Sequence, residues 1–74
     1  LVEGVEVAIA VKTYPDGKLT GKIRTNQPVA NSIAGFFGGG GHPYTAGFRI
    51  YEDYEPALDE IIKATGEALG DDQT

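Results

Sequence analysis

The sequence predicts an α+β domain in which a small mixed sheet carries two helices packed on one face, in the order β-β-α-β-α. Three observations support this class. Three segments alternate large apolar side chains with polar or small ones, as half-buried strands do. Two further segments repeat apolar residues at helical spacing. The length of 74 residues suits a single small core and leaves little room for a second one.

The first two strands form a predicted hairpin. In residues 5–11 the aliphatic side chains occupy every second position, which predicts a strand with one buried face. Residues 14–17, Tyr-Pro-Asp-Gly, follow and combine a proline suited to the second position of a turn with a glycine suited to a left-handed conformation. The returning strand, residues 18–25, places Leu19 and Ile23 on one face. Its other face carries three of the six basic residues, namely Lys18, Lys22 and Arg24.

The remaining segments predict a helix, a strand and a second helix. Residues 29–37 have helical spacing, and Gly38 is placed to supply the left-handed residue that ends this helix. Residues 44–50 alternate again and predict the third strand. The last helix begins at Asp53 or a neighbour and ends near Gly70. Its predicted buried stripe consists of Tyr54, Leu58, Ile61, Ile62, Thr65 and Leu69.

The aromatic residues are assigned mainly to the core. The spacing of Phe36, Phe37 and Phe48 on the predicted helix and strand indicates burial. Tyr44 has two interpretations: its ring is placed to stack on a base close to His42, but its alternation along the third strand favours burial. With both helices on one side, the opposite face of the sheet is expected to be free. We expect Lys22 and Arg24 to point from that face, beside the small residues Ala8 and Ala10.

Composition bounds the class of protein. Residues 1–70 are assigned to one domain and residues 71–74 to a disordered tail. The absence of cysteine excludes a disulfide framework, a thiolate metal site and a catalytic cysteine, and it suits a cytoplasmic setting. No stretch approaches the ~20 apolar residues of a membrane span. A net charge of −5 argues against broad, nonspecific binding to long nucleic acid, so that any nucleotide contact is expected to be local.

Four consecutive glycines, Gly38, Gly39, Gly40 and Gly41, separate the first helix from the third strand. They cost backbone entropy on folding and therefore need a physical reason. One interpretation is an anion nest, in which successive N–H groups turn toward a phosphate and no β-carbon blocks its approach. The other is a flexible tether between the two elements. The glycines alone do not decide between these two interpretations.

Two side chains outside the glycine run suit phosphate. His42, the only histidine, follows the last glycine, where an imidazole can bond a phosphate oxygen or stack on a base. As a metal ligand it is disfavoured, because no second histidine, cysteine or well-spaced carboxylate stands near it. Arg24 has a guanidinium group that suits bidentate contact with phosphate, and its alternative is an exposed ion pair with a glutamate. Lys18 and Lys22 are treated as solvated residues of the strand face.

Three runs of residues resemble the DHH-associated (DHHA) domain. They are residues 24–30 (Arg-Thr-Asn-Gln-Pro-Val-Ala), residues 33–34 (Ile-Ala) and residues 37–48 (Phe-Gly-Gly-Gly-Gly-His-Pro-Tyr-Thr-Ala-Gly-Phe). This domain forms the C-terminal part of many DHH-superfamily phosphoesterases, which include RecJ-like single-strand exonucleases, nano-RNases and cyclic-dinucleotide phosphodiesterases. In these proteins an N-terminal domain, named for its Asp-His-His motif, binds two manganese ions and hydrolyses the phosphodiester.

The resemblance implies that this chain holds a nucleotide or a short single-stranded nucleic acid, while the N-terminal DHH domain of the same protein performs the hydrolysis. The chain contains no Asp-His-His and is therefore expected to lack catalysis and metal ligands of its own. The implied substrate-binding residues are Arg24, Gly38, Gly39, Gly40, Gly41, His42, Thr45, Ala46 and Gly47. The glycines and His42 would hold the terminal nucleotide or phosphate, and Arg24 a phosphate from the neighbouring strand. Thr45 departs from the family, which more often has alanine there.

Two other functions stay open at this point. Related domains occur at the C-terminus of alanyl-tRNA synthetases, so the chain is alternatively a nucleic-acid-binding appendage of a non-hydrolytic enzyme. An Asp-His-His motif elsewhere in the same polypeptide would separate these readings. A dimerisation domain, whose basic face meets an acidic partner, is the third interpretation and predicts no nucleotide binding. The choice between DNA, RNA and cyclic dinucleotide, and the presence of a homodimer, are left open.

Overall fold

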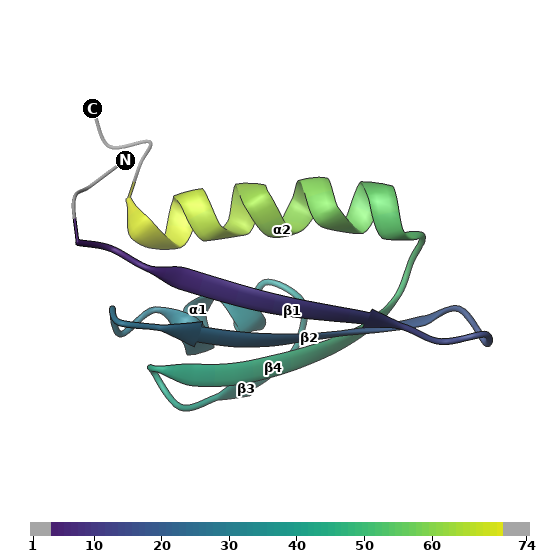
Figure 1. Ribbon diagram of the computed structural model, residues 1–74, viewed down its shortest axis with the longest axis horizontal. Coiled ribbons are helices and arrows are strands. Elements are labelled where there is room, and N and C mark those ends of the chain that lie inside the picture. Colours follow the sequence, from purple (N-terminus) through teal and green to yellow (C-terminus); the bar gives the residue numbers. More distant parts are fainter. Residues whose placement is uncertain (1–3, 71–74) are drawn as a thin grey trace.

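The computed structural model describes residues 4–70 of the 74-residue chain, which form a four-stranded sheet and two helices (Figure 1). In chain order the elements are β1 (Val7–Thr13), β2 (Lys18–Thr25), α1 (Ala30–Gly35), β3 (Gly40–Gly41), β4 (Thr45–Tyr51) and α2 (Tyr54–Leu69). The predicted α+β class is confirmed. The tail expected at residues 71–74 lies outside the described residues. Within residues 4–70, neither helix combines the length and the apolar composition that crossing a bilayer requires.

The sheet has the strand order β1-β2-β4-β3, and its pairings are antiparallel. The sequence predicts a mixed sheet of three strands, so the structure corrects both the strand directions and the strand number. The additional strand, β3, consists of Gly40 and Gly41, which pair with Gly47 and Ala46 of β4. Alternation of side chains cannot reveal a strand made of two glycines, because glycine has no side chain to alternate.

The β1–β2 hairpin closes through the predicted turn at residues 14–17. The Tyr14 N–H donates to the Lys18 carbonyl at 2.9 Å, and the Gly17 N–H donates to the Tyr14 carbonyl at 3.1 Å. Gly17 has a φ of 91°, a left-handed conformation that carries no β-carbon penalty for glycine. The Asp16 carboxylate accepts the Lys18 N–H at 3.0 Å and so stabilises the turn. This turn sets the register between the two strands.

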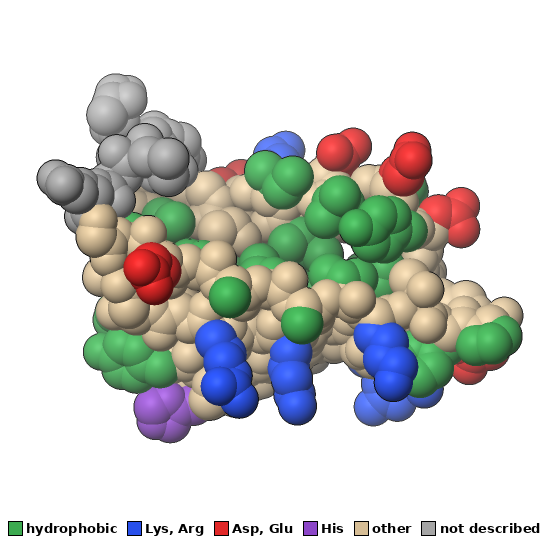
Figure 2. All heavy atoms as spheres, viewed as in Figure 1, with side chains coloured by type: hydrophobic (Ala, Val, Ile, Leu, Met, Phe, Trp, Pro, Cys, Tyr) green, Lys and Arg blue, Asp and Glu red, His purple; other side chains and the backbone are tan. Residues whose placement is uncertain are grey.

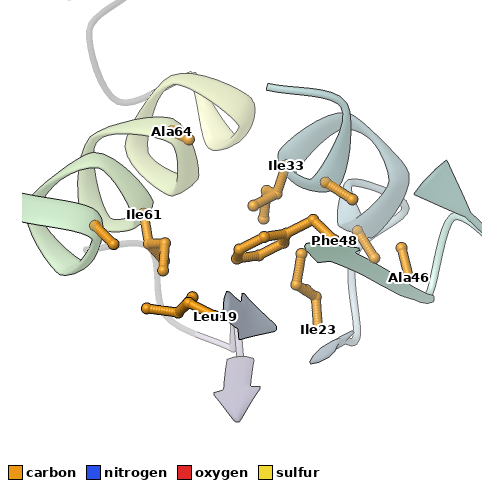
Figure 3. Close-up of a cluster of buried hydrophobic side chains, with 10 residues drawn as sticks. Leu19, Ile23, Ile33, Ala46, Phe48, Ile61 and Ala64 are labelled. Carbon is orange, nitrogen blue, oxygen red and sulfur yellow. The ribbon is translucent and has the colours of Figure 1, made fainter. Parts of the chain in front are cut away.

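Both helices lie on one face of the sheet, and the core fills the space between them and the strands (Figure 3). The largest fully buried side chains are Leu19 and Ile23 of β2 and Ile33 of α1. Phe48 of β4 and Ile61 of α2 meet them there. Because alternate residues of a strand point to opposite faces, burial of these positions leaves their neighbours in sequence on the face that no helix covers.

The ring of Phe48 occupies the core because the residue opposite it is a glycine. Gly21 pairs with Phe48 across β2 and β4, and a β-carbon at Gly21 would overlap the Phe48 ring. Phe37 stacks on the same ring, with centroids 4.5 Å apart and an interplanar angle of 26°. The glycine predicted to lie between Leu19 and Ile23 on the buried face therefore provides the volume that Phe48 fills.

Helix α1 is shorter than the predicted helix, which runs over residues 29–37. Its last residue is Gly35, and the chain then continues as turns in which the Phe37 N–H donates to the Ala34 carbonyl at 3.0 Å. Gly38 has a φ of 77° and is the left-handed residue that closes this end, as predicted.

Helix α2 follows Asp53 and ends at Leu69, and Gly70, whose φ of 78° is left-handed, caps it, as predicted. Its buried face differs from the predicted stripe. The buried residues of α2 are Ala57, Ile61 and Ala64. Tyr54 and Ile62, both members of the predicted stripe, are 50% and 64% exposed. The small alanine side chains bring α2 close to the rest of the core, while the larger aliphatic residues face a groove along β1.

The structure corrects two aromatic assignments. Phe48 is buried and Phe37 packs against the core, as predicted, but Phe36 is 54% exposed because α1 ends one residue before it. Tyr44 is 47% exposed, so the preference for its burial is wrong. It lies in the turn before β4, and the alternating pattern therefore extends one residue beyond the strand itself.

Candidate functional site

The face of the sheet opposite the helices, here called the open face, is built from alternate residues of β1, β2 and β4. Residues that pair across antiparallel strands point to the same face, so the registers arrange the open face in rows. The rows are Ala8, Arg24 and Thr45; then Ala10, Lys22, Gly47 and Gly40; then Lys12, Thr20 and Arg49; then Lys18 and Tyr51. The prediction that Lys22 and Arg24 share this face with Ala8 and Ala10 is confirmed.

The open face is basic although the chain has a net charge of −5. Five of the six Lys and Arg residues lie on it, namely Lys12, Lys18, Lys22, Arg24 and Arg49. Within β1, β2 and β4, as far as the structure describes them, no Asp or Glu occupies an open-face position. Glu6 precedes β1, but its main chain is still bonded to Asn26, and alternation places this exposed residue on the side of Ala8, beside the Arg24 row. Figure 2 shows most of the Lys and Arg side chains along the lower side of the molecule and several Asp and Glu side chains along the upper side, where α2 lies in Figure 1.

The glycine run forms neither a nest of four convergent N–H groups nor a flexible tether. The Gly38 N–H donates to the Gly35 carbonyl at 3.1 Å, and the Gly39 N–H donates to the Ala34 carbonyl at 2.9 Å, so both donors close the end of α1. Gly40 and Gly41 are paired with β4 instead of hanging free. The run therefore connects helix to sheet with a defined geometry.

Steric contacts explain two of the four glycines. A β-carbon on Gly39 would overlap the Gly47 carbonyl oxygen and would lie 2.7 Å from the Phe48 Cβ. Gly41 has a φ of 144°, and a β-carbon there would lie 2.9 Å from the Ala46 Cα. Both positions therefore need glycine so that β3 and the residue before it can pack against β4.

Gly40 has no such steric reason. Its φ lies outside the left-handed region, and a β-carbon built on it would meet nothing within 4 Å. It pairs with Gly47, where an added β-carbon would approach only the Gly21 carbonyl oxygen, at 3.3 Å. Together Gly40 and Gly47 leave a bare stretch of main chain on the open face beside Lys22. A ligand that touches this stretch would meet no side chain, which is a recurrent use of glycine at binding sites.

His42 occupies the tight turn between β3 and β4. Its N–H donates to the Thr45 carbonyl at 2.8 Å, and the Thr45 N–H donates to the His42 carbonyl at 3.2 Å. The ring Nδ1 accepts the Tyr44 N–H at 3.2 Å, so that a neutral imidazole carries its proton on Nε2. The rings of His42 and Tyr44 are exposed, with centroids 6.0 Å apart. The turn thus presents a hydrogen-bond donor and an aromatic ring to the solvent.

Arg24 and Thr45 face each other across β2 and β4, in the row nearest the His42 turn. Both side chains are exposed on the open face. Ala46, which the resemblance assigns to the binding site, instead points into the core and is 7% exposed. It lies between Thr45 and Gly47, and alternation along the strand sends it to the helix side of the sheet. Its side chain therefore belongs to the core.

Three basic or polar residues near the glycines were not assigned a role from the sequence. Lys18, Thr20 and Arg49 line a groove of about 500 Å³ that also includes Gly38 and Gly39. Arg49 lies two residues after Gly47, a spacing that already places it on the same face. Its proximity to Lys18 depends on the pairing of β2 with β4, which the sequence does not state.

A larger groove, of about 1030 Å³, runs between β1 and α2. Its walls are largely aliphatic and include Val5, Val7, Ile9, Leu58, Ile62 and Leu69, but Glu6, Arg24, Thr25, Asn26 and Thr65 also line it. Arg24 is the single basic residue among those that line this groove. The open face combines positive charge, hydrogen-bond donors and bare main chain, and we therefore place the candidate site there and not in the larger groove.

The titrating and metal-binding groups add little to the open face. Within residues 4–70, no three His, Asp or Glu residues form a cluster that could hold a metal ion. The pKa of Glu52 is raised from its ordinary value of 4.5 by desolvation, by a hydrogen bond and repulsion with Glu60, and by repulsion from Asp53. One Glu52 carboxylate oxygen is buried without a hydrogen-bond partner. This carboxyl lies between β4 and α2, outside the open face.

Comparison with known protein families identifies a single domain type along the chain. The family model of the DHHA1 domain matches residues 2–71. A search of curated proteins found no matching sequence. The matched residues include the whole open face, the glycine run and both helices, and the match confirms the resemblance drawn from residues 24–30, 33–34 and 37–48.

Proposed function

Because this chain belongs to the DHHA1 domain family, we propose that it is the substrate-binding domain of a metal-dependent DHH-family phosphoesterase. DHHA1 domains are associated with DHH-family phosphoesterases. In this proposal the chain holds a nucleotide or a short single-stranded nucleic acid on its open face. Another domain of the same protein hydrolyses the phosphodiester bond.

The convergence of Arg24, His42 and Gly40 at one end of the open face is the observation that best supports this proposal. Arg24 of β2 pairs with Thr45 of β4 on one side, and the main chain of His42, in the turn after β3, is bonded to Thr45 on the other, while Gly40 pairs with Gly47 in the next row. The guanidinium group of Arg24 would donate two parallel hydrogen bonds to a phosphate. The Nε2–H of His42 would donate a further one, and the bare main chain at Gly40 would admit the sugar next to it.

The other glycines act through position in this proposal. Gly38 and Gly39 close α1 and allow β3 to approach β4, so they place Gly40 and His42 without contacting the ligand themselves. Thr45 offers a hydroxyl group in the same row as Arg24. Ala46 contributes only to the core, which corrects the role that the resemblance implies.

The catalytic contribution of such a domain is orientation. A phosphate held by Arg24 and His42 fixes one end of the substrate. Because the substrate then loses its translational and rotational entropy on binding, the free-energy barrier of the chemical step is lower. In this proposal the manganese ions expected for the family are held by the other domain of the same protein. The residues of this chain bind and orient the substrate.

Titration with a 5′-phosphorylated dinucleotide, followed by amide resonances in nuclear magnetic resonance, tests the proposal. The amides of Gly40, Gly41, His42 and Arg24 are expected to shift together, with a dissociation constant in the millimolar range, or about −4 kcal/mol. The amides of Gly38 and Gly39 should shift less, because in this proposal these two residues close the end of α1 and do not contact the ligand. Shifts confined to α2 would contradict the proposed site.

Two substitutions sharpen this test. Arg24→Ala and His42→Ala each remove a donor to a charged group, worth about 1.5–3 kcal/mol, and should weaken dinucleotide binding by roughly tenfold or more. Lys63→Ala is the matched control, because it removes a basic residue of α2 and leaves the open face intact. All three variants should retain the wild-type circular dichroism spectrum. Unchanged affinity in both open-face variants would remove the roles assigned to these side chains.

A further inference from the structure

The open face carries a second group of cations at the end away from His42. This distal cluster consists of Lys12, Lys18 and Arg49. Lys12 and Arg49 flank Thr20 in one row of the sheet, and Lys18 lies in the next row. Along β2, Thr20 is four residues from Arg24, which at ~3.3 Å per residue is about 13 Å. A phosphate bound by Arg24 and His42 is therefore too far away to be contacted by the distal cluster.

A tyrosine ring gathers two of these cations. The Nζ atoms of Lys18 and Lys12 lie 4.2 Å and 5.2 Å from the centroid of the Tyr14 ring. Cation–π attraction thus holds two like charges at one end of the sheet. Asp16, the carboxylate nearest to Lys18 in the sequence, accepts the Lys18 backbone N–H in the turn. Repulsion between like charges held together in this way decreases when an anion binds between them.

The distal cluster also has a surface on which a ligand can rest. Lys18, Thr20 and Arg49 line the groove of about 500 Å³ beside Gly38 and Gly39. Tyr51 pairs with Lys18 across β2 and β4 and is 68% exposed, so its ring is free to stack on a base. Exposed aromatic rings beside a track of cations are the usual composition of a surface for single-stranded nucleic acid.

We propose that the open face binds a single-stranded oligonucleotide of about five nucleotides, whose phosphates run along β2 from the Arg24 end to the distal cluster. Even with stacked bases, at about 3.4 Å of rise per nucleotide, four steps cover the ~13 Å between the two groups of cations. Lys22 lies between them, beside the bare main chain of Gly40 and Gly47. This inference rests on the proposed function and specifies its substrate as an oligonucleotide, since a mononucleotide cannot reach both ends.

Salt dependence of binding, measured by fluorescence anisotropy, counts the phosphates that the chain contacts. Each contact with a single strand contributes a slope of about −0.7 to the plot of log K against log salt concentration. With one phosphate each at Arg24, at Lys22, at Arg49 and at the Lys12–Lys18 pair beside the Tyr14 ring, raising the salt from 50 to 200 mM should weaken the binding of a hexathymidylate about 50-fold. A 5′-phosphorylated dithymidylate that contacts only Arg24 and Lys22 should lose about sevenfold over the same range.

The triple variant Lys12→Ala/Lys18→Ala/Arg49→Ala removes the distal cluster and so separates the two ends of the face. Its hexathymidylate binding should show the sevenfold salt effect of the dinucleotide, and its dinucleotide binding should equal that of wild type. Lys63→Ala provides the control for loss of a positive charge away from the face and should keep the 50-fold effect. A hexaglutamate peptide tests for a general anion surface, because it has charge but no bases to stack.

The outcomes distinguish this inference from the function on which it rests. If wild type binds the dinucleotide and the hexanucleotide with equal affinity and equal salt slope, the distal cluster is not part of the site, while the proposed function stands. Hexaglutamate binding as tight as hexathymidylate binding would also overturn the inference. If neither oligonucleotide binds, or if Arg24→Ala leaves dinucleotide binding unchanged, the proposed function itself fails.

Discussion

Substitution of adjacent glycines by alanine gives opposite expected results at Gly39 and Gly40. A methyl group at Gly39 would overlap the Gly47 carbonyl oxygen and approach the Phe48 Cβ to 2.7 Å, and both atoms belong to or adjoin the β4 main chain. Overpacking of this kind costs about 1–3 kcal/mol, and the upper part of that range applies because backbone cannot move aside as a side chain can. The loss of unfolded-state entropy returns about 0.5–1 kcal/mol.

The net expectation is that Gly39→Ala lowers the free energy of unfolding by about 2 kcal/mol. For a domain of this size, this corresponds to a fall of about 8–16 °C in the melting temperature. A β-carbon added at Gly40 would meet no atom within 4 Å, and Gly40 has no left-handed φ, so the melting temperature of Gly40→Ala should equal or exceed that of wild type. Thermal and urea unfolding, followed by circular dichroism, measure both changes, and the urea m-value should stay constant.

Binding reverses the order of the two variants. Gly40→Ala places a methyl group on the bare main chain beside Lys22 and should weaken dinucleotide binding although its fold is intact. If Gly39→Ala has the same melting temperature as wild type, β3 and β4 are not packed as described. A Gly40→Ala variant with wild-type affinity would show that the ligand does not approach this stretch of main chain.

Three further substitutions test the core, the titration of a carboxyl group and the start of β1. Gly21→Ala should destabilise the fold by about 1–3 kcal/mol in urea, and the loss should be less than additive with Phe48→Leu, which removes the ring it would overlap. The raised pKa of Glu52 means that this carboxyl group binds a proton more tightly in the folded than in the unfolded protein, so its contribution to stability falls as the pH rises above 4.5. Glu52→Gln should therefore have a higher melting temperature than wild type at pH 7, and the difference should vanish toward pH 4. Asn26→Ala removes a side chain that accepts one main-chain N–H at 2.9 Å and donates to a main-chain carbonyl at 2.6 Å before β1, so hydrogen exchange should accelerate there and stability should fall by about 1 kcal/mol.

The sequence predicted the hairpin turn and the left-handed glycines beyond the two helices correctly, because these features depend on the conformation of a few neighbouring residues. The turn at residues 14–17 and the left-handed residues Gly38 and Gly70 are in the structure where the sequence places them. The buried face of α2 was predicted less well, since helical spacing accommodates two overlapping stripes. Large side chains such as Ile62 favoured one stripe, whereas packing selected the other, which contains two alanines. That choice depends on the neighbouring elements, which a local pattern does not contain.

For the candidate site too, features set within one strand could be predicted from the sequence, whereas features set by strand pairing could not. Alternation along β2 sufficed to place Lys22 and Arg24 on the open face, because strand parity alone assigns a face. Alternation along β4 likewise predicts that Ala46 points away from the open face. Resemblance to a family does not distinguish residues that bind a ligand from residues that position them, and for this reason Ala46 was assigned to the site. The proximity of Lys18 to Arg49 required the pairing of β2 with β4. Such non-local pairings are set by the whole sheet and not by either strand.

The net charge does not describe the charge of the open face, because it averages over both sides of the molecule. In the direction that separates the basic face from the acidic side chains of α2 in Figure 2, the chain extends 23 Å. Electrostatic interactions in physiological salt are screened over about 8 Å. The carboxylates of α2 therefore cancel little of the field over the open face, where five cations act on a nearby anion. A chain with a net charge of −5 thus still has a local surface suited to a polyanion, whose size is limited to the length of that face.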